Sequence, residues 1–187
     1  MSLLIAHRTR AKVGEAQSGD AVVVRHVGDT TLFAVVDALG HGATAAEAAR
    51  RSVQHLEQAP LDGIKALMSG LHKALRGSRG AAATLCLYRD GALEGCGVGN
   101  VEVRARGTRI PAVLSPGILG SHHSTLRVFS TKLAPQDRLA VFSDGISRTL
   151  SLEPTGPTPL EDACARLFHS FACPDDDATL LLAEATG

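Results

Sequence analysis

The stretch Thr31-Leu-Phe-Ala-Val-Val-Asp37-Ala-Leu-Gly-His-Gly42 joins an apolar, β-rich run to an aspartate at a glycine turn. Later in the chain, Arg138-Leu-Ala-Val-Phe-Ser-Asp144-Gly145 repeats this pattern. Asp and Gly both weaken strands, and an unpaired charge is costly to bury, so such strand ends do not favour folding by themselves. Two of them indicate carboxylates gathered around a cation, and a divalent metal ion is the obvious candidate.

Composition indicates one globular domain without a nucleic-acid or membrane partner. A length of 187 residues suits a single domain, and 44% hydrophobic residues allow a sizeable core. Lys plus Arg equals Asp plus Glu at 19 each, so the chain lacks the basic excess typical of nucleic-acid binding. No apolar stretch approaches the roughly 20 residues of a membrane span. The first residues turn polar too soon for a signal peptide and predict a strand instead.

The four cysteines, Cys86, Cys96, Cys164 and Cys173, form no C-x-x-C pair. This spacing does not support a zinc site. Cys86 lies in Thr84-Leu-Cys-Leu-Tyr88, a pattern typical of an apolar strand. We therefore expect free, inert thiols in a reducing cytoplasm.

Hydrophobic periodicity predicts strands, then two helices, then a long run of strands, a helix and a final strand. Strands are expected over residues 20–27 and 31–36, and later over 81–88, 92–98, 101–106, 110–114, 125–131, 138–143 and 178–184. Helices are expected over 43–58, 61–75 and 160–171, and the prolines of residues 151–159 predict a loop. Regular βαβ alternation is missing, which argues against a Rossmann-like sheet. We predict an α+β domain in which sheets pack face to face and helices cover the outside.

Acidic residues occur at four strand ends. Asp20 opens one strand, Asp37 and Asp144 each end one, and the run 175–177 precedes the last. Carboxylates are ligands of hard divalent ions, and about four negative charges would be balanced by two such ions. Each aspartate alone also fits a turn residue, a helix cap or a solvated acidic cluster. Together they predict a two-metal site that acts on phosphoryl groups.

Four motifs, in order, resemble those of a known family. Gly19-Asp20, Asp37-Ala-Leu-Gly-His-Gly42, Ser143-Asp-Gly145 and Asp176-Asp-Ala-Thr179 are similar to the motifs of metal-dependent PPM/PP2C serine/threonine phosphatases, in particular the bacterial SpoIIE-like branch. The resemblance implies a PP2C-like αββα sandwich of two mainly antiparallel sheets flanked by helices. It spans nearly the whole chain, so we expect one phosphatase domain over residues 1–187 with no separate sensor domain. The stretch 95–104 also resembles the stressosome feedback phosphatases called RsbX.

The resemblance implies a role for each matched residue. Asp37 would bridge two metal ions, and Ala38 would donate its backbone carbonyl, although many relatives carry Gly at that position. Asp144 and Asp176 would bind the first ion. Asp20 would lie by the second ion, directly or through water. Manganese or magnesium fits this all-oxygen set better than zinc does.

The resemblance defines three further positions less sharply. Asp177 is expected to be a supporting ligand, whereas Asp175 has no counterpart in the motif. His41 could donate a proton to the leaving serine or threonine oxygen, or contact phosphate. A structural histidine that caps or packs fits its residue type better, so both interpretations of His41 stay open.

The implied reaction is hydrolysis of phosphoserine or phosphothreonine on a signalling protein by a metal-bridged hydroxide. The RsbX-like stretch points to phosphorylated stressosome scaffold proteins as partners, with a role in damping the stress response. Two alternatives stay open. One is an inactive phosphatase-like module that only docks a regulatory partner, and the other is a different two-metal hydrolase such as a nuclease, which the neutral charge disfavours.

Overall fold

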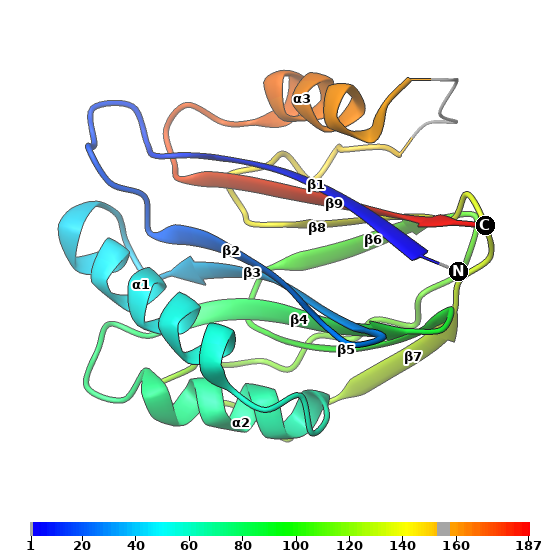
Figure 1. Cartoon of the computed structure of the whole chain (residues 1–187). Helices are drawn as coiled ribbons and strands as arrows, with labels where there is room; N and C mark the ends of the chain where they lie inside the picture. Colours follow the sequence, from blue (N-terminus) through cyan, green and yellow to red (C-terminus); the bar gives the residue numbers. More distant parts are fainter. Residues whose placement is uncertain (1, 153–157) are drawn as a thin grey trace.

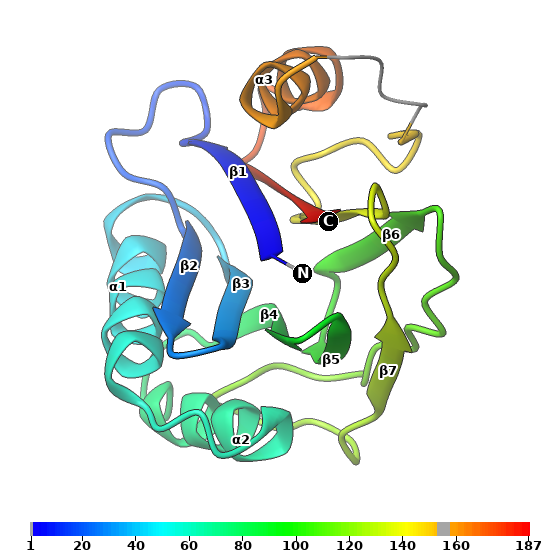
Figure 2. The same cartoon turned by 45° about the vertical axis from the view of Figure 1, so that its right-hand side comes forward.

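Two antiparallel sheets stack face to face between helices in the computed structural model, which describes residues 2–152 and 158–187 (Figure 1). One sheet has the strand order β1-β9-β8-β6, and the other has the order β2-β3-β4-β5-β7. Helix α3 covers the outer face of the first sheet, whereas α1 and α2 cover the outer face of the second (Figures 1 and 2). This is the αββα sandwich that the sequence predicts.

Most elements begin and end close to their predicted positions. Among the described residues the strands are β1 Ser2–Arg10, β2 Asp20–Val27, β3 Thr30–Ala38, β4 Ala81–Arg89, β5 Ala92–Val98, β6 Glu102–Arg106, β7 Val128–Lys132, β8 Arg138–Phe142 and β9 Ala178–Thr186. The helices are α1 Gly42–Gln58, α2 Ile64–Ala74 and α3 Leu160–Phe171. The predicted loop over 151–159 lies partly outside the described residues.

One predicted strand does not form, and the predicted starts of two other elements are wrong. Residues 110–114 form no strand, because Pro111 lacks an N–H and Ser115 makes only an isolated bridge with Val98. Helix α2 begins three residues late, since Gly63 sits at φ 128° and breaks the helical backbone before Ile64. Strand β7 likewise begins at Val128 rather than at residue 125.

Three apolar layers hold the sandwich together, and β3 contributes to two of them. Leu32, Ala34 and Val36 pack against α1 and α2, while Phe33 and Val35 face the other sheet. A strand buried on both faces reads as a continuous apolar run, which explains the stretch that precedes Asp37. A third layer under α3 is formed by residues that include Phe142, Leu150, Cys164, Leu180 and Leu182.

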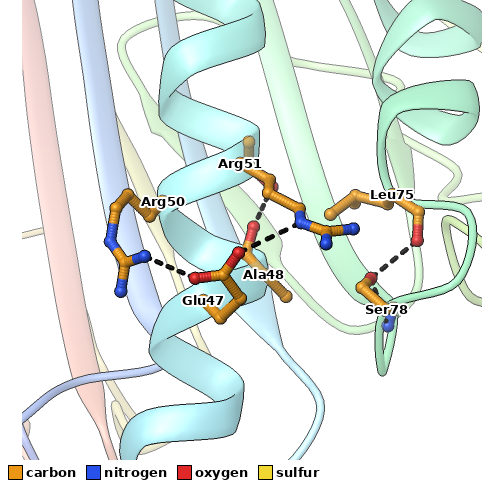
Figure 3. Close-up of polar contacts among 8 residues, drawn as sticks. Glu47, Ala48, Arg50, Arg51, Leu75 and Ser78 are labelled. Carbon is orange, nitrogen blue, oxygen red and sulfur yellow. Dashed lines mark hydrogen bonds and ion pairs between the residues drawn. The ribbon is translucent and has the colours of Figure 1, made fainter.

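The outward face of α1 is polar, as expected for a helix that covers a sheet. Glu47 pairs with both Arg50 and Arg51 one turn further along this face (Figure 3). Near the end of α2, the Ser78 hydroxyl donates to the Leu75 carbonyl at 2.6 Å (Figure 3). Exposed ion pairs of this kind contribute little to stability, so the apolar face holds α1 in place.

All four cysteines are free thiols, as predicted, and three of them are buried. Burial raises the pKa of Cys86, Cys96 and Cys164, so these thiols stay protonated and inert. No helix among the described residues is long and apolar enough to cross a bilayer.

Candidate active site

The β2–β3 pair brings the first two predicted ligands together. Asp20 at the start of β2 lies directly across from Asp37 near the end of β3. Directly opposed residues of an antiparallel pair have Cβ atoms about 4.5–5.5 Å apart. On the other side of β3, Asp37 lies across from Ala82, whose small side chain leaves room above the carboxylate.

Ala38 has a backbone suited to its expected role. It ends β3, and among the described residues the only non-glycine positions with positive φ are Asp90 and Gln136. The Ala38 N–H donates to the Gly19 carbonyl at 3.0 Å, which ties the end of β3 to the start of β2. An alanine is therefore accommodated where many relatives have glycine.

A cavity of about 350 Å³ collects four of the predicted residues from three separate segments. Asp37 comes from β3, His41 precedes α1, Asp144 follows β8, and Asp176 precedes β9. These segments meet at the left end of the sandwich in Figure 1. The cavity is also lined by Lys12, Leu39, Gly40, Ala82, Asn100 and Asp175.

Burial and neighbouring negative charges together raise the pKa values of the clustered carboxyls. Burial raises the pKa of Asp37 to about 8, and the charges of Asp20, Asp144, Asp176 and Asp177 add to that shift. Burial and Asp176 also raise the pKa of Asp144, although hydrogen bonds with Asp37 and Asn100 oppose the rise. A cation bound here would reverse these shifts, because each carboxylate would gain an opposite charge.

Asp20 is buried and is bonded by the S-D-G segment. Ser143 donates its hydroxyl to Asp20 Oδ2 at 2.5 Å and accepts the Thr179 N–H at 3.0 Å. Burial raises the pKa of Asp20 to about 7, against the effect of the Ser143 and Thr179 hydrogen bonds. Ser143 thus links β2, β8 and β9 at the carboxylate.

Asp177 has a structural role in addition to the supporting metal-ligand role expected from the sequence. Its two carboxylate oxygens accept the N–H groups of Lys12 at 2.8 Å and Gly19 at 2.7 Å. The side chain is buried among these donors rather than lining the cavity. Asp177 therefore fixes the loop between β1 and β2, whether or not it also approaches a metal ion.

His41 is the N-cap residue of α1, yet its side chain makes no capping hydrogen bond. Its Nδ1 instead lies 2.6 Å from Oε1 of Glu15, a residue of the loop between β1 and β2. The capping role considered for His41 is therefore not what the structure shows.

Four further residues of the site were not identified from the sequence. Asn100 Nδ2 donates to Asp144 Oδ2 at 2.7 Å, and the guanidinium of Arg79 lies over Gly40, where an added Cβ would be 2.6 Å from its Nη1. Ser143 belongs to a quoted motif, so its position was a usable signal. Asn100 lies in the stretch 95–104 that resembles RsbX, which was also a usable signal, whereas Glu15 and Arg79 lie outside every quoted stretch and no spacing rule connects them to the aspartates.

The oxygen-rich donor set suits a hard divalent ion such as Mg²⁺ or Mn²⁺. Among residues 2–152 and 158–187, no three His, Cys, Asp or Glu side chains converge as they stand closely enough to enclose an ion. Asp20 and Asp177 already accept short hydrogen bonds from protein donors, so an ion would have to compete for them. The carboxylates around Asp37 repel one another, so a bound cation would stabilise them. In that respect the residues fit a divalent metal ion.

A larger hollow of about 700 Å³ lies at the opposite end of β3 and β4, beside Thr30 and Arg89. Its charged side chains include both signs, such as Asp62 and Lys132, and none of its lining residues belongs to the four motifs. Cavity size therefore does not decide where the chemistry lies; the carboxylate cluster does.

A two-sheet αββα sandwich with aspartates gathered at one end of the sheets defines the class of PP2C-type serine/threonine protein phosphatases. Residues 28–186 match the family model of Stage II sporulation protein E (SpoIIE), so the chain belongs to the SpoIIE family. A comparison with curated proteins gives no significant match.

Solved structures agree with this class. One described as "The bacterial stressosome: a modular system that has been adapted to control secondary messenger signaling" is 29% identical, with a TM-score of 0.86 over 98% of this chain and 100% of the other. RsbX in complex with magnesium is 19% identical, with a TM-score of 0.83 over 97% and 94%. The PP2C phosphatase domain of SpoIIE from Bacillus subtilis is 18% identical, with a TM-score of 0.76 over 99% and 64%. At such low identity the last two show the fold alone.

Proposed function

We propose that this phosphatase removes phosphate from phosphoserine or phosphothreonine on a bacterial stressosome protein and requires Mn²⁺ or Mg²⁺. The observation that carries the proposal is the cluster around Asp37, where burial and the charges of four other aspartates raise the pKa of one carboxyl beside a cavity. The likeness to a stressosome-related chain and to RsbX supports the choice of partner. Four free thiols are consistent with action in a reducing cytoplasm.

Five residues would hold the metal, which we propose is a pair of ions. The ions would be held by the carboxylates of Asp37, Asp144, Asp176 and Asp20 and by the Ala38 carbonyl. When bound, Mn²⁺ or Mg²⁺ supplies positive charge that polarises phosphoryl oxygens and makes water more acidic. RsbX has been crystallised with magnesium, which supports this choice of ion.

The remaining tasks fall to residues of the chain itself. Asn100 holds the Asp144 carboxylate in place through its 2.7 Å hydrogen bond. Arg79, whose guanidinium lies over Gly40, would bind a phosphoryl group, because a guanidinium forms paired hydrogen bonds with phosphate oxygens. His41 faces the same cavity and would protonate the leaving oxygen.

Turnover of p-nitrophenyl phosphate and of a phosphorylated stressosome scaffold protein, with and without Mn²⁺, tests the proposal. We expect metal-dependent hydrolysis of both, and its loss in Asp37→Asn. Asp90→Asn, in the exposed β4–β5 turn, makes the same chemical change away from the site and should retain activity.

The alternatives predict different results. A docking module would bind the scaffold protein without any metal-dependent turnover. A nuclease would cleave DNA or a cyclic nucleotide in preference to a phosphoprotein. Either result would overturn the proposal.

A further inference from the structure

The loop between β1 and β2 places a carboxylate on the active-site histidine. Glu15 Oε1 lies 2.6 Å from His41 Nδ1, and both side chains are partly exposed, at 32% and 47%. Glu15 precedes the part of the chain that the family model matches, which starts at residue 28. Glu15 therefore lies outside the matched residues, whereas His41 lies within them.

The loop is clamped so that Glu15 stays in place. The Asp177 carboxylate accepts the Lys12 N–H at one end of the loop and the Gly19 N–H at the other. Between these anchors, the Glu15 N–H donates to the Lys12 carbonyl at 3.0 Å. One buried side chain thus fixes both ends of the segment that carries Glu15.

The start of α1 leaves space for the Glu15 carboxylate. Gly42 has φ +73°, and a Cβ there would lie 2.8 Å from Glu15 Oε2. Any other residue would be strained by the backbone angle and would push against the carboxylate. The Glu15 carboxylate therefore lies between the His41 ring and the backbone of Gly42.

We infer that Glu15 is a positioning residue for His41, an inference that rests on the proposed function. An ionised carboxylate only accepts hydrogen bonds, so at 2.6 Å the facing Nδ1 must carry a proton. With Nδ1–H held by Glu15, the Nε2 atom is the one free to exchange a proton with the substrate. The cavity that His41 lines is also lined by the charged residues Lys12, Asp37, Asp144, Asp175 and Asp176, and Arg79 lies over Gly40.

His41 would supply one proton to the leaving oxygen while water attacks phosphorus. Water attacks phosphorus, and the P–O bond to the serine or threonine Oγ breaks with its electron pair on Oγ. The cationic His41 ring gives its Nε2 proton to Oγ, so the alcohol leaves neutral. The ring keeps its Nδ1 proton, which stays hydrogen-bonded to Glu15. A proton released from the attacking water then returns to Nε2 and restores the cationic form of the ring.

Two substrates that differ in their leaving group separate this role from a structural one. p-Nitrophenolate leaves as a stable anion without a proton, whereas a serine alkoxide needs one. We expect Glu15→Gln to lower kcat/KM for a phosphoserine peptide by about tenfold or more, and His41→Ala by roughly 100-fold. Turnover of p-nitrophenyl phosphate should change by less than about threefold in both.

Matched variants complete the experiment. The double variant Glu15→Gln/His41→Ala should be no slower than His41→Ala, because both changes remove one function. Glu57→Gln makes the same change at an exposed position near the far end of α1 and should leave both rates unchanged. Equal losses on the two substrates, or no loss on the peptide, would overturn the inference.

A measurement that needs no turnover decides the inference even if the phosphatase proposal fails. In ¹⁵N NMR spectra of the protein, the neutral His41 ring should carry its proton on Nδ1, and Glu15→Gln should shift the proton toward Nε2. An Nε2-protonated ring in the parent protein would contradict the inference. Absence of metal-dependent phosphatase activity would instead overturn the proposed function alone.

Discussion

Asp20 lies directly across from Asp37 in the β2–β3 pair, so the fold places two carboxylates side by side at a partly buried strand end. Like charges directly opposed on adjacent strands destabilise a sheet. Burial is the main cause of the raised pKa values of Asp20 and Asp37, which are about 7 and about 8, and neighbouring carboxylates add to both shifts. Such an arrangement favours whatever neutralises it, whether protons or a metal ion.

The metal-free protein should lose stability as pH rises. In the unfolded chain both carboxyls titrate near pH 4, whereas in the folded chain they keep their protons to about pH 7 and 8. Between about pH 4 and pH 8 the native state therefore binds more protons, and its free energy of unfolding falls with pH. Melting curves in EDTA should show Tm falling between pH 5 and 8.5, and Mn²⁺ should flatten this slope. A Tm that rises over this range in EDTA would count against the prediction.

Asp37→Asn should stabilise the metal-free protein while it abolishes turnover. The substitution removes a carboxylate that is repelled by four others, at nearly unchanged volume. We expect a gain of about 1–3 kcal/mol at pH 8, measured by urea unfolding in EDTA. Asp90→Asn should leave the unfolding curve in place. A loss of stability in Asp37→Asn would mean that Asp37 makes favourable contacts in the absence of metal.

Ser143→Ala should destabilise the protein. The substitution leaves Asp20 Oδ2 without its 2.5 Å donor and the Thr179 N–H without its acceptor, both buried. Such losses cost about 1–3 kcal/mol, which urea unfolding would detect. The exposed Ser130 on β7 provides a control, since Ser130→Ala should change stability by less than about 0.5 kcal/mol. Equal unfolding midpoints for the two variants would refute the Ser143 network.

Asn100→Ala should weaken metal binding without unfolding the chain. Asn100, the chain's single asparagine, orients Asp144 through a charge-assisted hydrogen bond. Loss of such a supporting contact typically lowers metal affinity by about 10–100-fold. Calorimetric titration with Mn²⁺ measures this directly, with Gln54→Ala on the exposed side of α1 as the amide control. An unchanged affinity would show that Asp144 needs no such support.

Arg79→Ala should raise KM for the phosphoprotein by about tenfold, because the guanidinium over Gly40 would contact the phosphoryl group. Arg79→Lys should restore only part of the affinity, since an ammonium lacks the paired hydrogen bonds. Steady-state kinetics in Mn²⁺ measure both, beside Arg76→Ala as an exposed control. If KM is the same in all three variants, Arg79 lies outside the substrate path.

Local sequence was enough to predict most elements and the ends at which the aspartates lie. The apolar run before Asp37 defines a strand buried on both faces, and Asp-Gly turns and Pro60 mark boundaries without reference to distant residues. It failed at residues 110–114, where Pro111 prevents a regular ladder despite the apolar pattern. Hydrophobic periodicity reports only on side chains, whereas a strand in a sheet also needs backbone N–H groups that donate hydrogen bonds to its neighbour.

The sequence by itself determined an α+β domain of face-to-face sheets, because periodicity and turn residues are written along the chain, and its ordered acidic motifs carry the resemblance that implies the αββα class. Only the tertiary structure decided which neighbours those residues have. Glu15 meets His41, Asn100 meets Asp144, and Asp177 clamps a loop far from it in sequence. These contacts join segments through the stacking of two sheets, and such long-range pairings leave no local pattern from which they could be predicted.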